Sequence, residues 1–172
     1  MTFPAGEPVT SFTWRDALDK DNGSSMAIVF ADDGERIITA TWGGLVRVWK
    51  SATGNEEHRL NRFPMPLSRV MVSPAKKQFL TLCDDRSAQL WSTETGDLLA
   101  SFTGHSLHLT DAAFDPAGRR LVTTSSDGTA RVWDAQSPQS AEVARFKGHT
   151  HELRVVTSAP TGRVLATGSR DG

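Results

Sequence analysis

The sequence repeats with a period of 42 residues, and this repeat limits the folds open to the chain more than any other feature. Trp49, Trp91 and Trp133 are each separated by 42 residues. The pairs Thr53-Gly54 and Thr95-Gly96 fall in the same phase. Agreement at several phased positions is typical of an internal repeat. The period therefore indicates a chain built from copies of one supersecondary unit.

Each period contains four short apolar runs separated by turn sequences. In the third copy these runs span residues 110–115, 120–125, 129–134 and 141–146. The runs are too short for stable helices and are rich in β-branched residues. The run 129–134 alternates between faces, as a half-buried strand does. We expect four antiparallel strands per period, which describes one blade of a β-propeller.

Composition narrows the class of protein. The chain of 172 residues has a formal net charge of −1, which predicts no nucleic-acid partner and no anionic-membrane surface. The N-terminus lacks the features of a secretory signal, and there is no run of 18 apolar residues to span a membrane. Cys83 is the only cysteine, which excludes an intrachain disulfide and fits a reducing compartment. We therefore expect a cytoplasmic, all-β protein.

Four motifs in the third copy carry a family resemblance. They are Gly104-His105, Phe114-Asp115-Pro116-Ala117-Gly118, Ser125-Ser126-Asp127-Gly128 and Val132-Trp133-Asp134. Together they resemble a near-consensus repeat of the WD-repeat β-propeller family. Gly148-His149 and Ser169-Arg170-Asp171-Gly172 are similar to the beginning of a further repeat. The resemblance covers nearly the whole chain from about Ala27, and its motifs are specific for the fold and almost silent on function.

The resemblance implies a division of the chain into blades. We expect an N-terminal segment with an outer strand at 8–12, two degenerate blades, a near-consensus third blade and a partial fourth: residues 1–26, 27–60, 61–102, 103–146 and 147–172. Such a chain would form an open arc or a fragment of a larger ring. The alternatives are self-association through the open blade edge into a full ring, or a small ring closed by the N-terminal strand.

His105, Ser125, Asp127 and Trp133 have the residue types of a catalytic serine-histidine-aspartate set. The resemblance implies instead a buried structural network, in which the histidine links the aspartate to the serine and the serine reaches the indole N–H. Physical reasoning agrees, because buried polar groups need partners and an indole N–H is a donor only. Partial copies of this set occur at His149, Ser169, Asp171, Asp85, Trp91 and Trp49. We therefore expect a repeated structural network and no catalytic residue.

The sequence predicts no metal site and no cofactor. His58, His108 and His151 share no recognisable spacing with a third ligand. Gly43-Gly44 lies in a turn between strands and is not followed by a helix, so it does not match a phosphate-binding loop.

The candidate binding residues lie in the loops that join strands two and three and in those that lead into the next strand one. In the WD-repeat family these loops share one face, which usually binds peptides and proteins. The residues expected on that face are Trp14, Trp42, Asp84, Arg86, His108, His151 and Arg170. Trp42 stands where the other copies have a polar residue, and tryptophan and arginine are enriched at binding hot spots. The alternative is that Trp14 and Trp42 merely cover an irregular first blade.

These observations predict a non-catalytic scaffold that binds a protein or peptide partner through the loop face. One alternative is a sensor or regulatory segment of a larger multidomain signalling protein. A second is a propeller enzyme, which would need acids, histidines or metal ligands converging near the axis.

Overall fold

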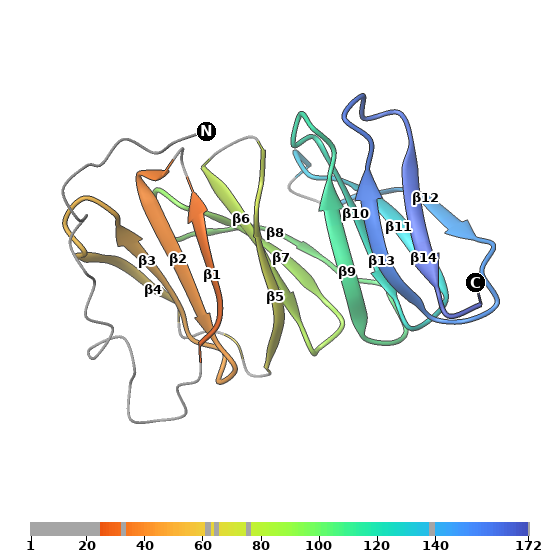
Figure 1. Cartoon of the computed structure of the whole chain (residues 1–172), viewed down its shortest axis with the longest axis horizontal. Coiled ribbons are helices and arrows are strands. Elements are labelled where there is room, and N and C mark those ends of the chain that lie inside the picture. The colour runs from red at the N-terminus through yellow and green to blue at the C-terminus, as the bar shows by residue number, and fades with distance from the viewer. Residues whose placement is uncertain are drawn as a thin grey trace, which may run out of the picture.

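The regular structure of the chain is entirely β. The computed structural model describes residues 25–31, 34–60, 63, 66–74, 77–137 and 140–171. Within these ranges the chain forms fourteen strands and no α-helix (Figure 1). The two sequence predictions at 8–12 and Trp14 lie outside the described residues.

Consecutive strands pair into antiparallel sheets, which we name blade 1, blade 2, blade 3 and the half-blade. Blade 1 contains β1 (Ser25–Ala31), β2 (Arg36–Thr41), β3 (Val46–Lys50) and β4 (Glu56–Leu60). Blade 2 contains β5 (Leu67–Val72), β6 (Gln78–Cys83), β7 (Ala88–Ser92) and β8 (Leu98–Phe102). Blade 3 contains β9 (Leu109–Phe114), β10 (Arg120–Ser125), β11 (Thr129–Asp134) and β12 (Glu142–Lys147). The half-blade contains β13 (Leu153–Ser158) and β14 (Leu165–Ser169).

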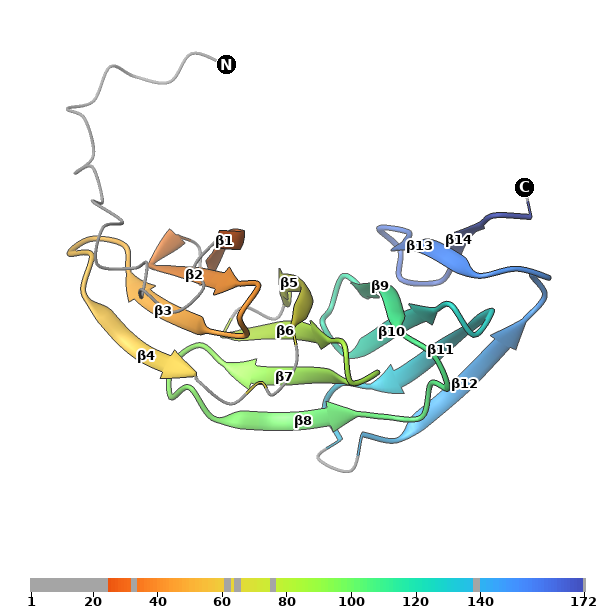
Figure 2. The same ribbon diagram turned by 90° about the horizontal axis from the view of Figure 1, so that it is seen from below.

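The blades stand side by side along an open arc. Their first strands, β1, β5, β9 and β13, lie on the concave side, and β4, β8 and β12 lie on the convex side (Figure 2). Neighbouring blades contact each other through β1 with β5, through β6 with β9 and through β9 with β13. The described part of the chain is therefore an all-β, open propeller arc, as the repeat predicts.

The hydrophobic core lies between blades. Trp91 of blade 2 packs with Ile38 and Val48 of blade 1, and Trp133 of blade 3 packs with Leu80 and Leu90 of blade 2. The middle strands of a blade are therefore covered on both faces. The expectation of a half-buried strand at 129–134 is wrong for this reason, because Thr129 through Trp133 are all buried. Burying both faces is how a stack of thin sheets acquires a continuous core.

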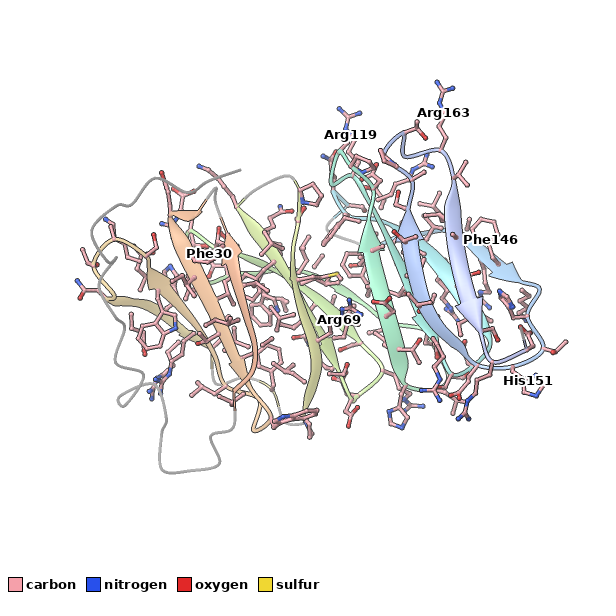
Figure 3. The ribbon with its side chains drawn as sticks, viewed as in Figure 1. Phe30, Arg69, Arg119, Phe146, His151 and Arg163 are labelled. Atoms are coloured by element: carbon pink, nitrogen blue, oxygen red, sulfur yellow. The ribbon has the colours of Figure 1, made fainter. Side chains whose placement is uncertain are left out.

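Asp111 on β9 ties blade 3 to both of its neighbours. One carboxylate oxygen pairs with the Arg69 guanidinium on β5 at 2.5 Å, and the other accepts the backbone N–H of Val156 on β13 at 3.1 Å. Asp111 is only 3% exposed, whereas Arg69 is half exposed between blades 2 and 3 (Figure 3). A buried carboxylate is tolerated when charged and backbone donors surround it. No motif in the sequence predicts this link.

Candidate functional site

A chain of hydrogen bonds runs through blade 3 from a core tryptophan to the turn between β10 and β11. The Trp133 indole N–H donates to the Thr123 hydroxyl oxygen at 2.8 Å, and Thr123 lies 2.9 Å from His105 Nε2. His105 Nδ1 lies 3.0 Å from an Asp127 carboxylate oxygen. These four side chains come from four different segments: β11, β10, the connection before β9 and the turn between β10 and β11. We call them the strut: Trp133, Thr123, His105 and Asp127.

The direction of the bonds in the strut follows from its aspartate end. An ionised carboxylate can only accept, so His105 Nδ1 carries the proton and donates it to Asp127. In a neutral imidazole Nε2 is then the acceptor, so it receives the Thr123 hydroxyl hydrogen, while the Thr123 oxygen accepts the Trp133 indole N–H. The strut is fully satisfied with a neutral histidine and an ionised aspartate.

The pKa values of the pair agree with this assignment. Burial lowers the pKa of His105 below its ordinary value of 6.5, and this effect outweighs the attraction of Asp127, which acts to raise it. Burial acts to raise the pKa of Asp127, but hydrogen bonds from Thr129, His105 and the Ser106 amide outweigh it and hold that pKa well below its usual range. His105 therefore stays neutral and Asp127 stays ionised near pH 7.

The hydroxyl in the strut is Thr123, so the prediction that Ser125 links His105 to Trp133 is wrong. Ser125 instead donates to the Leu107 carbonyl at 3.0 Å and accepts the Asp127 backbone N–H at 3.1 Å. Ser125 lies at the end of β10 and serves the turn, whereas Thr123 lies one pleat deeper, level with the histidine ring and the indole. Among the residues that the structure describes, no base contacts the Ser125 hydroxyl, so a serine-nucleophile role has no geometric support.

A threonine occupies the position equivalent to Thr123 in each of the other blades. Trp49 donates to Thr39 at 2.9 Å, Trp91 donates to Thr81 at 3.1 Å, and His149 Nε2 lies 3.1 Å from Thr167. Thr39, Thr81 and Thr123 are spaced by 42 residues, so the period that aligned the tryptophans also carried the signal for their acceptors. The position of Ser125 holds Thr41, Cys83 and Ser169 in the other copies, a variability that fits its lesser role.

The other members of the predicted network occupy partial copies of the strut. In the half-blade, His149 Nδ1 lies 2.8 Å from Asp171, whose pKa is lowered by that hydrogen bond and by the Thr150 amide. Ser169 donates to the Glu152 carbonyl at 2.9 Å, as Ser125 does to Leu107. In blade 2, Asp85 is exposed and caps its turn through the Ser87 backbone and hydroxyl.

Gly104 is required by the packing of the strut. A Cβ atom at this residue would collide with the Arg131 guanidinium, and the backbone has φ +139°, which disfavours any side chain. Arg131 is held there by the Glu142 carboxylate at 2.8 Å. The Gly-His pair is therefore a packing requirement of a buried joint.

The candidate binding residues that the structure describes gather at one end of the blades, which we call the loop face. Because the strands are antiparallel, the turns between second and third strands and the connections into the next blade share this end. Trp42 lies there with 55% of its surface exposed, and Leu107 is 49% exposed. His151 lies at this same end and projects outward from it (Figure 3). Trp42 is thus an exposed aromatic side chain on the turn between β2 and β3.

The charged residues of the loop face pair within the face. His108 Nδ1 lies 3.7 Å from Asp84, and Arg170 lies 3.2 Å from Glu152. Arg86 donates to the Ser106 carbonyl at 3.2 Å. His151 contacts the Thr150 hydroxyl at 3.1 Å. Asp84 with His108, and Ser126 with Glu152, are equivalent contacts between successive units, so this part of the face is a repeated interblade seam.

Arg86 adopts a backbone conformation that the other copies assign to glycine. Its φ is +72°, close to +79° at Gly44 and +78° at Gly128 in the equivalent turns. A left-handed conformation costs a residue with a side chain about 1 kcal/mol. The hydrogen bond from the Arg86 guanidinium to the Ser106 carbonyl joins blade 2 to the segment that leads into blade 3.

Cys83 is a core residue without signs of reactivity. It is 3% exposed, and burial, followed by the nearby Asp85 charge, raises the pKa of its thiol to about 11. A thiol with a raised pKa is a poor nucleophile at neutral pH.

Three segments of the chain match the family model described as "WD domain, G-beta repeat": residues 19–50, 96–134 and 140–172. Together they cover more than half of the sequence. The chain belongs to the WD40 repeat family. WD40 repeats generally mediate protein–protein interaction and are typically non-catalytic. No curated protein matches the chain.

The arrangement of side chains in this WD40 chain fits a binding scaffold. Among the residues that the structure describes, no three histidine, cysteine, aspartate or glutamate side chains gather in a way that could hold a metal ion. No helix in the described ranges is long and apolar enough to cross a membrane. The histidine–aspartate pairs join the turns to the core of their blades.

Proposed function

We propose that this WD40 chain is a non-catalytic scaffold that docks a peptide or an extended protein segment on the loop face, with Trp42 as the main anchor. The observation that carries the proposal is the exposure of Trp42, at 55%, in a turn where Asp84, Ser126 and Arg170 occupy the equivalent position. The fold does not need an aromatic residue there. Large aromatic side chains with exposed surface are the groups that most often dominate binding energy.

The pairing of charges on the loop face supports an apolar anchor. Arg170 is engaged by Glu152, and Arg86 by the Ser106 carbonyl. A partner that used these charges would have to break existing contacts and would gain little net energy. Trp42 and Leu107 carry no such cost, because burying their exposed apolar surface is favourable by itself. The preferred partner segment therefore carries a bulky apolar side chain.

The test uses peptides selected from a random library on the full chain, with their affinities measured by calorimetry on the chain and its variants. Trp42→Ala is expected to weaken binding of the selected peptides about tenfold or more, as a hot-spot residue would. Leu99→Ala is the matched control, because Leu99 is 40% exposed on the convex strand β8. Its affinities are expected to equal those of the unmodified chain.

Two results would contradict the proposal. One is a set of selected peptides whose affinity is unchanged by Trp42→Ala. The other is an equal loss in Leu99→Ala, which would move the binding surface to the convex side.

A further inference from the structure

A row of cationic side chains lies at the end of the blades opposite the loop face. Lys77, Arg119 and Arg163 are exposed residues in the turns between the first and second strands of blade 2, blade 3 and the half-blade. Figure 3 shows Arg119 and Arg163 projecting from the end of the blades that lies farthest from His151. We call these three side chains the basic row.

The turns hold the basic row in one repeated position. The carbonyls of Lys77 and Arg119 each accept a backbone N–H from the turn before the fourth strand, from Thr93 and Ala135, at 2.9 Å in both cases. Glu35 of blade 1 accepts the Ser51 N–H at the same distance. These matching bonds make Glu35, Lys77 and Arg119 equivalent, so the charge at this position is acidic in blade 1 and basic in the next two blades.

The turns that carry Arg119 and Arg163 lie against each other. A Cβ built on Gly162 would be 3.3 Å from the Pro116 side chain and 3.9 Å from Asp115. The acid nearest in sequence, Asp115, is engaged with its own turn, since one of its carboxylate oxygens accepts the backbone N–H groups of Arg119 and Arg120. Neither Arg119 nor Arg163 has an ion pair with a carboxylate among the residues that the structure describes. Their guanidinium groups are open to an outside anion.

We propose that the basic row is a second docking surface, which binds a carboxylate-rich peptide segment of a partner protein lying across the turns of blade 2, blade 3 and the half-blade. Planar guanidinium groups bind carboxylates through paired hydrogen bonds, so Arg119 and Arg163 supply the attraction. Lys77 extends the row into blade 2, where its ammonium group pairs with Glu94 at 3.4 Å. The net charge of the whole chain is −1, so attraction of an acidic segment depends on this local row.

The observations favour a peptide over other anionic partners. Single-stranded nucleic acid binds where aromatic rings accompany the cations. The exposed aromatic residues of the described ranges are Phe30, Trp42 and Phe146, and none belongs to the turns of the basic row. Anionic membrane surfaces are bound through larger basic clusters or amphipathic helices, and the described residues form no helix there.

The experiment measures the anisotropy of a fluorescein-labelled oligo-glutamate peptide titrated with the full chain. The peptide is expected to bind at low salt and to weaken as salt rises toward about 0.15 M, where surface charges are screened. Arg119→Glu combined with Arg163→Glu is expected to weaken binding about tenfold or more, because attraction becomes repulsion. Glu35→Arg extends the row into blade 1 and is expected to tighten binding.

The matched control is Lys147→Glu combined with Arg154→Glu, which makes the same change in net charge on β12 and β13. It is expected to leave the affinity unchanged. Equal binding by the chain and the Arg119/Arg163 variant, or equal losses in that variant and in the control, would overturn the proposal. Tighter binding of an oligothymidine strand or of phosphatidylserine vesicles than of the peptide, lost in the same variant, would overturn the assigned partner class.

This surface is independent of the loop face. Trp42→Ala is expected to leave the oligo-glutamate affinity unchanged, and the Arg119/Arg163 variant is expected to leave loop-face peptides bound. A loss of both kinds of binding in either variant would contradict two separate surfaces.

Discussion

Blade 2 and blade 3 have the same four-stranded sheet but use different residues to close it. In blade 3 the strut joins Trp133 to the turn aspartate through His105. In blade 2, Phe63 stands at the position of His105 and packs edge-on against Trp91, with ring centroids 5.3 Å apart. His105 lies edge-on to Trp133 at 6.5 Å, so the two rings occupy similar places. An apolar contact has replaced a polar one without altering the sheet.

The bond that both blades keep is the one between tryptophan and threonine. Trp91 to Thr81 measures 3.1 Å, and Trp133 to Thr123 measures 2.8 Å. This bond satisfies the indole N–H inside the core, where an unpaired donor would cost about 1–3 kcal/mol. The histidine and aspartate extend the bond to the turn and are dispensable where a phenylalanine fills the space.

The largest effect is expected from removing the core tryptophans. Trp91→Ala and Trp133→Ala should each lower the free energy of unfolding by about 3–5 kcal/mol, because both side chains are at most 2% exposed. Urea unfolding checks the values, and Trp42→Ala, at an exposed site, should change stability by less than about 0.5 kcal/mol. A much smaller loss for Trp91→Ala than for Trp133→Ala would mean that the two blades do not share one kind of core.

An intermediate loss of stability is expected from removing the threonine hydroxyls that accept the two indole N–H groups. Thr123→Val leaves the Trp133 N–H and the His105 ring nitrogen without their shared hydroxyl, and about 2–3 kcal/mol should be lost. Thr81→Val removes the partner of the Trp91 N–H and should cost about 1–2 kcal/mol. Thermal unfolding of both variants beside Thr161→Val, the same change on an exposed turn, checks the ranking. Equal losses of stability in Thr123→Val and Thr81→Val would contradict the proposed difference between blade 3 and blade 2.

The strut should also make blade 3 sensitive to acid. Because the pKa of His105 is lowered in the folded chain, the unfolded state binds the extra proton, and stability falls as pH drops below about 6.5. The lowered pKa of Asp127 adds a second loss below its ordinary value of 3.8, with the same sign.

His105→Phe, which copies Phe63 of blade 2, should therefore show a shallower fall in the urea midpoint between neutral and mildly acidic pH than the unmodified chain. His151→Phe, at an exposed histidine, serves as its control and should retain the full dependence. An unchanged pH dependence in His105→Phe would exclude His105 as its source.

The smallest effect is expected at the position where blade 2 has Cys83 and blade 3 has Ser125. Cys83→Ser should cost about 1 kcal/mol or less, because the equivalent site already accommodates a serine. With its pKa raised to about 11 and its side chain buried, Cys83 should react with Ellman's reagent at mildly alkaline pH only after urea unfolds the chain. Rapid reaction of the folded chain would contradict the buried assignment.

The positions of repeated elements could be predicted because their signals lie close together in the sequence. The spacing of Trp49, Trp91 and Trp133 and the turn residues between them predicted an all-β propeller arc, and the structure confirms that fold class. The family resemblance implied Ser125 as the acceptor of the Trp133 indole N–H, whereas the structure shows Thr123 in that role. Thr123 had the better periodic support, but only the depth of its strand position selects it.

The periodic pattern of the sequence alone determined the architecture, since alternation, turn chemistry and a repeated tryptophan are local properties of the chain. Only the tertiary structure decided which side chains meet across blades: Asp111 with Arg69 and Val156, and the turns of Arg119 and Arg163 with each other. These contacts depend on how thin sheets stack, because stacking brings together side chains that are far apart in the sequence and that no local pattern pairs. Both proposed docking surfaces arise from that stacking.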